Sequence, residues 1–298
     1  MMGMYAAISG LEVNQTMLNV TANNLANVNT VGYKAANIDF ADSLAQTLRG
    51  AAGAGAASGG TNPVQVGLGS QISATVNEMG EGAFVTTNAP LDIAIEGRGF
   101  LRVGPGTPPA EPPYTTGVPT AIEYTRAGNL STDAKGFLTT QAGQYVVGFN
   151  AVATAGPEGT TYAPGTEQSY LRIPPGSADI SIAPNGAVTY VDENPVSPTV
   201  GQQVTAGYIS LAQFPNEAGL ERLGGSLWGA TANSGTPLVG VPGTNGLGTT
   251  IGGELESSNV NLAGEMTNMI TAERGYQANS RVITTADTML EAAVSMVH

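Results

Sequence analysis

The C-terminal stretch LAGEMTNMITAERGYQANSRVITTADTMLEAAVSMVH (262–298) decides the fold, because apolar or small side chains recur in it every three and then four residues. A 3.5-residue repeat keeps one stripe of a helix facing a neighbouring helix. The stripe comprises Leu262, Met269, Ala272, Tyr276, Asn279, Ile283, Ala286, Leu290, Ala293 and Val297. No proline interrupts it, so we predict one long helix that begins near residue 258, with Ser257, Ser258 or Asn259 as its N-cap.

The same spacing near the N-terminus predicts a second helix, from about residue 4 to residue 27. Its stripe comprises Met4, Ile8, Leu11, Leu18, Ala22 and Leu25. Glu12 is the only charged residue before Lys34, so this helix lacks a charged solvent face and is expected to be buried on several sides. A helix of about 60 Å at the C-terminus exceeds one of about 36 Å at the N-terminus, given a rise of about 1.5 Å per residue. We therefore expect the two stripes to pair the helices and to contact further subunits.

Between about residues 72 and 214 the pattern changes to short β-like runs separated by turn signals such as Gly97-Arg98-Gly99, Lys135-Gly136 and Asn185-Gly186. This pattern predicts a mainly β, sandwich-like or barrel-like domain. Two Pro-rich stretches, 104–119 and 151–176, are predicted to be loops or small excursions from the β domain. A short helix is expected over 40–49, and the tract GAAGAGAASGG (50–60) is expected to be a linker.

The expected fold class is therefore α+β, with N- and C-terminal helices paired as a coiled-coil layer and a mainly β central domain. The predicted helical domain comprises residues 1–30 and 258–298. Connecting segments are expected at 31–71 and 241–257, and the β-rich outer domain at 72–240. The Gly-rich parts of the connecting segments are candidate hinges.

The composition excludes most catalytic and binding chemistry. A net charge of -13 repels nucleic acid, and the absence of cysteine removes disulfides and thiolate metal sites. The single histidine is His298, so a catalytic triad and a multi-histidine zinc site lack their parts. The carboxylate pair Asp192 and Glu193 is expected to be a solvated turn. We predict no catalytic, cofactor-binding or metal-binding residue, no cofactor, no enzyme activity and no membrane insertion.

One stretch is more specific than these patterns: Ala22-Asn23-Asn24-Leu25-Ala26-Asn27-Val28-Asn29-Thr30-Val31-Gly32-Tyr33-Lys34. It resembles the N-terminal signature of the bacterial flagellar rod and hook family. The signature residues are Ala22, Asn23, Asn24, Leu25, Ala26, Asn27, Asn29, Thr30, Gly32, Tyr33 and Lys34. Further stretches that resemble family motifs are 91–100, 125–130, 255–262 and 274–281.

The segments 60–69, 232–237 and 277–281 resemble hook proteins more than distal rod proteins. Long hook proteins carry an extra outer β domain where this chain has only about 150–176, so the resemblance implies a short hook protein. Such a structural subunit polymerises into a helical tube and acts as a flexible joint that transmits torque from rod to filament. The resemblance implies self-association and contact with the distal rod, the hook cap, the hook-filament junction proteins and the flagellar export apparatus. It also implies an extracellular location in the flagellum, reached without a cleaved signal peptide.

Two alternatives stay open from the sequence. The first is the distal rod protein, a straight drive shaft of the same family. The second is of another class: a secreted β-sandwich adhesin or carbohydrate-binding module would explain the turn-rich middle, but it has no use for helical stripes at both ends.

Overall fold

The computed structural model describes residues 2–53, 59–109, 117–156, 159–193, 195 and 199–296. Contacts within the chain divide it into two compact units. We call Met1–Asn27, Ala35–Glu78 and Val260–His298 the helical unit, and Val28–Lys34 with Met79–Asn259 the β unit.

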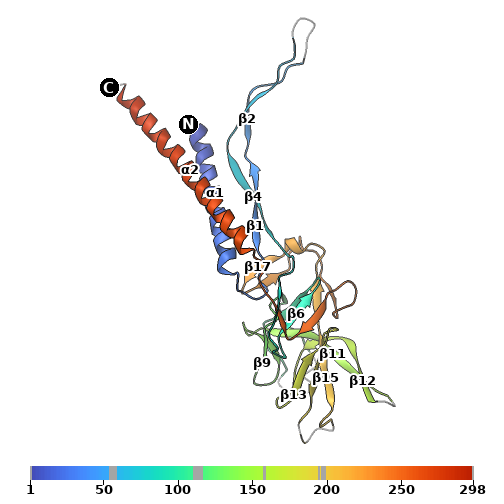
Figure 1. Cartoon of the computed structure of the whole chain (residues 1–298). Coiled ribbons are helices and arrows are strands. Elements are labelled where there is room, and N and C mark those ends of the chain that lie inside the picture. The colour runs from blue at the N-terminus through green and yellow to red at the C-terminus, as the bar shows by residue number, and fades with distance from the viewer. Residues whose placement is uncertain are drawn as a thin grey trace. The chain divides into compact units, whose positions relative to one another are not determined.

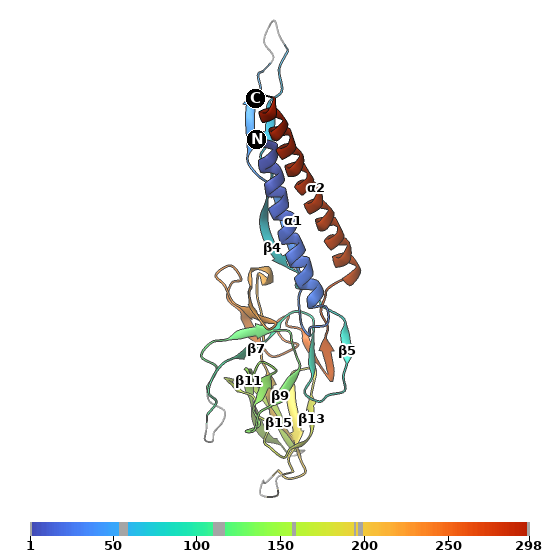
Figure 2. The same ribbon diagram turned by 90° about the vertical axis from the view of Figure 1, so that its left-hand side faces the viewer.

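In the helical unit, α1 (Met2–Ala26) and α2 (Leu262–Ser295) lie side by side in both views (Figures 1 and 2). The N-cap of α2 is Asn261, whose side chain accepts a hydrogen bond from the backbone N–H of Gly264. The prediction that Ser257, Ser258 or Asn259 caps this helix is therefore wrong. Ser257 donates its N–H to Ala83 O and Asn259 donates to Tyr33 O, so this stretch is still held by backbone bonds of the β unit.

The helical unit also contains a long antiparallel ribbon. Strand β1 (Ala36–Asp42) pairs with β4 (Ser70–Asn77), and β2 (Ala45–Arg49) pairs with β3 (Val64–Gly67). The predicted helix over 40–49 is wrong, because these residues satisfy their backbone groups across the ribbon. Of the predicted linker 50–60, Ala52 forms a β-bridge with Thr61, and 54–58 lie outside the described residues.

The β unit is built on one curled sheet, to which the described residues contribute 13 strands in the path β13-β14-β15-β11-β7-β8-β18-β17, with β9, β10, β12, β16 and β19 paired to its sides. The bounds are β7 (Phe100–Gly104), β8 (Glu123–Thr125), β9 (Leu130–Thr132), β10 (Leu138–Thr140), β11 (Tyr145–Gly156), β12 (Gly159–Tyr170), β13 (Ala178–Ile182), β14 (Ala187–Val191), β15 (Gln203–Ile209), β16 (Leu211–Gln213), β17 (Glu221–Gly224), β18 (Leu227–Gly229) and β19 (Leu238–Gly240). A short 3₁₀ helix spans Glu217–Gly219.

Two further strand pairs complete the β unit. Strand β6 (Ile93–Glu96) pairs with β20 (Thr249–Gly252), and β5 (Phe84–Thr86) pairs with β21 (Glu254–Glu256). The segment 241–257, expected from sequence to be a connection, thus contains β20 and β21.

The predicted turns at Gly97-Arg98-Gly99, Lys135-Gly136 and Asn185-Gly186 are confirmed, since each joins two strands. The stretch 151–176, predicted to be a loop or a small excursion from the β domain, is not a loop. Most of it belongs to the hairpin of β11 and β12, in which Val152 lies opposite Ala163. In the stretch 104–119, residues 110–116 lie outside the described residues.

The largest core cluster of the β unit consists of inward-facing side chains of its strands, including Ile93, Leu101, Val146, Val188 and Ile209. A second cluster gathers Phe100, Tyr124, Phe214 and Trp228. Aliphatic and aromatic burial of this kind stabilises by about 1.5–3 kcal/mol per side chain, which is enough to order so many short strands.

Candidate assembly surfaces

The face of α1 that is buried inside the helical unit is not the predicted stripe. Ala7, Val13, Thr21 and Asn24 are the buried residues of α1, and they face α2 or the ribbon. Of the stripe residues, Met4, Leu11, Leu18 and Leu25 are half-buried, whereas Ile8 and Ala22 are exposed. The described chain thus covers the predicted stripe of α1 only in part, and the uncovered surface can contact another molecule.

On α2 the predicted stripe is also covered only in part. Ala272 is fully buried, and Met269, Asn279, Ile283 and Ala286 are half-buried. The remaining described members are exposed, namely Leu262, Tyr276, Leu290 and Ala293, and Val297 lies outside the described residues. Every described residue from 287 to 296 is exposed, so the end of α2 packs against nothing in the described chain.

Two reciprocal pairs of a glycine and an asparagine bring the helices close together. A Cβ placed on Gly10 would lie 2.6 Å from Nδ2 of Asn279, and one placed on Gly275 would lie 2.5 Å from Oδ1 of Asn14. These pairs make α1 and α2 antiparallel. Both helices carry Gly-x-x-x-Asn, at 10–14 and 275–279. Of these four residues only Asn279 belongs to a predicted stripe, so the repeated motif is the signal that could have found the other three.

At the other end of the helix pair, Asn24 joins three elements. Its Nδ2 donates to Ala36 O at 2.8 Å and to Oε1 of Glu265 at 3.1 Å, and its Oδ1 accepts from Ala36 N at 3.0 Å. The amide thus pairs with the start of β1 as a neighbouring strand would. This signature residue fixes α1 against both β1 and α2.

In the β unit, the signature segment ends in a buried charge cluster, which we call the Glu256 cluster: Lys34, Arg126 and Glu256. Glu256 Oε1 lies 2.6 Å from Lys34 Nζ, and Glu256 Oε2 lies 3.2 Å from Arg126 Nη1. The three side chains are 1%, 2% and 0% exposed. Charges buried to this degree need several partners, because desolvation opposes them.

Backbone groups from separate segments supply those partners. Lys34 Nζ also donates to Gly80 O at 2.8 Å, and Glu256 Oε1 accepts from Gly82 N at 2.9 Å. Arg126 Nη2 donates to Gly97 O at 2.7 Å. Burial lowers the pKa of the Lys34 ammonium, although Glu256 beside it acts in the opposite direction. The cluster therefore ties together segments that are far apart in sequence.

Gly32 and Tyr33 complete the docking of the signature segment. Gly32 has a φ of +66°, and a Cβ there would lie 2.5 Å from the backbone nitrogen of Ala127. Arg222 donates to Lys34 O at 2.6 Å, and its guanidinium lies over the rings of Tyr33 and Trp228 at 4.8 and 5.0 Å. Only glycine fits at position 32, because there is no room for a Cβ and the backbone has a positive φ. The Tyr33 ring contributes a cation–π contact with Arg222.

The rest of the signature is less enclosed. Gly32, Tyr33, Lys34 and Asn24 are buried, while Leu25, Asn27 and Thr30 are half-buried and Ala22, Asn23, Ala26 and Asn29 are exposed. Some signature residues are therefore buried and stabilise the fold of the subunit, and others are exposed in the described chain.

The described residues contain no group of three or more side chains suited to a metal ion. None of the helices in the described chain has the length and apolar character needed to cross a bilayer. Asp192, expected to be solvated, is instead buried and accepts a hydrogen bond from Thr199 Oγ1 at 2.8 Å, while Glu193 is exposed. The two carboxylates therefore differ in environment, and Asp192 has a structural partner.

Comparisons with known proteins match three parts of the chain. Residues 4–34 match the family model "Flagella basal body rod protein", residues 94–190 match "Flagellar hook protein FlgE/F/G D1 domain", and residues 251–296 match "Flagellar basal body rod FlgEFG protein C-terminal". These three regions include the signature segment and Glu256.

Whole-length relatives were also found. The chain is 37% identical to the flagellar basal-body rod protein FlgG of Bacillus subtilis, over 98% of both chains. It is 36% identical to FlgG of Caulobacter vibrioides, again over 98% of both. The flagellar hook protein FlgE of Borreliella burgdorferi is 25% identical over 439 aligned positions and 99% of both chains.

Proposed function

The chain belongs to the family of bacterial flagellar basal-body rod and hook proteins, which are structural subunits and not enzymes, and on that premise we propose that it polymerises as a subunit of the flagellar rod. An axial structural subunit of the flagellum fits the lack of catalytic groups in the sequence.

Length and identity support the rod over the hook. The chain aligns with 98% of the Bacillus subtilis rod protein at 37% identity, whereas the alignment with the Borreliella burgdorferi hook protein extends to 439 positions at 25% identity. The hook protein therefore carries long insertions relative to this chain. This assignment revises the hook prediction made from short motifs.

One observation supports the proposal that the chain polymerises: the helical unit exposes apolar side chains that the rest of the described chain does not cover. They include Met266, Ile270, Val282, Met289 and Val294 on α2, and Leu44, Leu48 and Val64 on the ribbon. Strands β2 and β3 form the outer, two-stranded part of the ribbon, and a two-stranded hairpin by itself is only marginally stable in water. Burial of these side chains between copies supplies the missing stabilisation, at about 1.5–3 kcal/mol for each fully buried side chain.

Under this proposal, α1 and α2 form the inner coiled-coil layer of a tube, and the β unit lies outside it. The contact is heterologous, so repetition from copy to copy gives an open helical assembly. Neighbouring axial proteins and the flagellar export apparatus are its further partners, and export proceeds without signal-peptide cleavage.

The hook remains a second candidate, because the segment Gln277-Ala278-Asn279-Ser280-Arg281 resembles hook proteins. Electron microscopy of the native assembly distinguishes the two. A straight tube is expected for the rod, and a curved, supercoiled tube would assign the chain to the hook.

A deletion tests the polymer mechanism. We expect the chain without residues 262–298 to remain soluble and to form no tubes, because the α2 surface is gone. Tubes formed by the shortened chain would overturn the helical-layer mechanism.

A further inference from the structure

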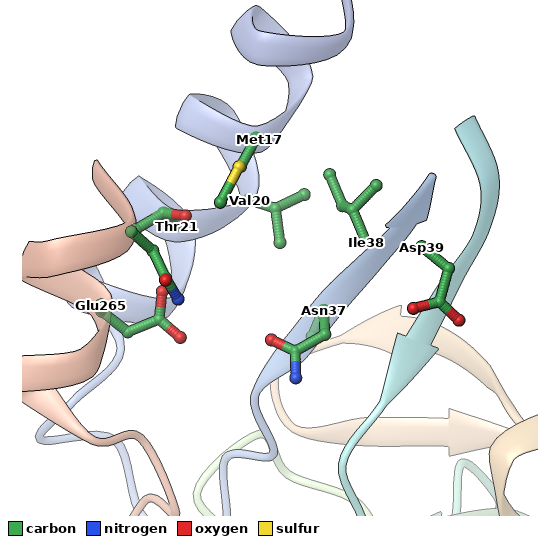
Figure 3. A pocket seen from close by; sticks show the side chains of 9 residues that line it. Met17, Val20, Thr21, Asn37, Ile38, Asp39 and Glu265 are labelled. Carbon is green, nitrogen blue, oxygen red and sulfur yellow. The ribbon is translucent and has the colours of Figure 1, made fainter. Parts of the chain in front are cut away.

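The helical unit contains a pocket of about 310 Å³ lined by α1, the start of β1 and the first turns of α2 (Figure 3). Its apolar lining comes from Met17, Val20 and Ile38, and its polar lining includes Asn37 and Asn268. Figure 3 shows the Glu265 carboxylate and the Asn37 carboxamide facing the pocket from opposite sides. The pocket thus offers both apolar side chains and polar groups to a side chain that enters it.

Two carboxylates line this pocket, and no basic residue does. Glu265 is only 7% exposed, and its Oε1 accepts a hydrogen bond from Asn24, while no group of the described chain donates to its Oε2. Asp39 is exposed and also lines the pocket, and its carboxylate accepts no hydrogen bond from the described residues. A buried carboxylate that lacks a charged partner favours a cation, and apolar walls favour the alkyl stem of an arginine.

The same unit presents a suitable arginine elsewhere. Arg281 lines a shallow hollow on the outer face of α2 with Val282, Thr285, Ala286 and Met289. Arg281 is exposed, and its side chain forms no ion pair with the part of the chain that the structure describes. This surface offers a cation among apolar side chains, whereas the pocket offers carboxylates among apolar side chains.

We propose that Arg281 of one copy enters the pocket lined by Asp39 and Glu265 of a second copy. The inference rests on the proposed polymer and names the contact that joins its subunits. Arg281 and Glu265 are separated by 16 positions on α2, so this contact shifts neighbouring copies by about 24 Å along the helices. Because the two surfaces differ, the contact does not close and extends into a filament.

The absence of cysteine from the chain allows a direct test by cross-linking. Asn268→Cys and Thr285→Cys place one thiol in the pocket and one in the hollow, and they leave all three charged residues intact. The assembled double variant is treated with a short bismaleimide. We expect a ladder of covalent multimers, because each copy joins two neighbours. The same two thiols are about 25 Å apart along α2 within one copy, too far for the reagent to bridge.

Ala278→Cys replaces Thr285→Cys in the control, since Ala278 is exposed on the same face two turns earlier and outside the hollow. Ladders that are absent from the first pair, or equally strong for the control pair, would overturn the inference. Failure of the unsubstituted chain to form tubes under electron microscopy would count against the proposed function instead.

A charge exchange provides the second measurement. We expect Arg281→Glu to raise the concentration needed for assembly at least tenfold, and Asp39→Arg in the same chain to restore most of the loss. Arg274→Glu is the matched control, because it changes the net charge equally on the same helix. Equal loss for Arg274→Glu, or no restoration by Asp39→Arg, would contradict the contact.

Discussion

The ammonium nitrogen of Lys34 lies 2.6 Å from Oε1 of Glu256, although the two residues are 222 positions apart in the chain. Arg126 holds the other oxygen of the same carboxylate at 3.2 Å. Three of the four points at which the chain passes between units, 34/35, 78/79 and 259/260, lie within a few residues of this cluster or its backbone partners. The cluster therefore holds in place the ends of the β-unit segments at which the chain continues into the helical unit.

Replacing Lys34 by methionine is expected to destabilise the β unit by about 3 kcal/mol. Breaking a buried ion pair costs about 3–5 kcal/mol, and the low end applies here because Arg126 still pairs with Glu256. Urea unfolding followed by the fluorescence of the single tryptophan, Trp228, measures the change. Lys135→Met is the control, since Lys135 is exposed and should cost little. A loss below about 1 kcal/mol for Lys34→Met would contradict a structural role for the cluster.

The same residue predicts a pH dependence. Burial lowers the pKa of Lys34 below its ordinary value of 10.5, against the opposing effect of Glu256. Between the lowered pKa and 10.5 the unfolded chain binds a proton that the folded chain does not, so the Lys34 contribution to stability rises with pH in this window. Below the lowered pKa both states are protonated, and the contribution stays at its minimum.

Unfolding of the parent chain and of Lys34→Met, measured from neutral pH to 10.5, isolates this contribution. Tyr124, Tyr170, Tyr190 and Tyr208 have pKa values raised by burial, which lowers stability above pH 10, but they are present in both chains and cancel. We expect the parent to gain stability relative to the variant as pH rises toward 10.5. A constant or falling difference would contradict this sign.

The sequence predicted the two terminal helices and a mainly β region between them, because the helical periodicity is long and regular and the turn signals recur. Fewer than half of the individual strands were predicted, since many of them span only three to five residues. The sequence prediction failed at residues 40–49 for a specific reason. Phe40, Leu44 and Leu48 are four positions apart, a spacing that places side chains on one face of a helix but, being even, also on one face of a strand. Only the partners supplied by β3 and β4 decide between the two, and these follow later in the chain.

The candidate surfaces were predictable to a lesser degree. An apolar stripe indicates that a helix packs, but a close contact of α1 and α2 uses Gly10, Asn14 and Gly275, which lie outside the predicted stripes. Their partner Asn279 is the one member of this contact that the spacing included. The pairing of Lys34 with Glu256 leaves no periodic trace, because it joins a turn to a distant strand.

Gly32→Ala tests the docking of the signature segment. A side chain at φ +66° costs about 1–2 kcal/mol, and the new Cβ would also meet the backbone of Ala127. Gly143→Ala is the matched control, because Gly143 has a φ of +78° and no atom within 4 Å of a Cβ. We expect thermal unfolding to show a loss for Gly32→Ala that exceeds the control by at least about 1 kcal/mol. Equal losses would mean that backbone conformation alone requires this glycine.

Gly275→Ala tests the contact between α1 and α2. Helix propensity and steric contact with Asn14 change the stability in opposite directions, so the sign of the change shows which of them is larger. Alanine is better than glycine inside a helix by about 1 kcal/mol, so stabilisation is expected wherever space is free. At Gly275 the added Cβ would lie 2.5 Å from Oδ1 and 2.9 Å from Cγ of Asn14, and that side chain is held by its own 2.6 Å bond to Gly10 O. Asn14 cannot withdraw without losing this bond, which is worth about 1 kcal/mol.

We therefore expect Gly275→Ala to lower the melting temperature of the helices, followed by circular dichroism. Gly3→Ala, whose Cβ meets nothing within 4 Å, should leave it unchanged or raise it. An increase for both variants would show that the helices do not depend on this close approach.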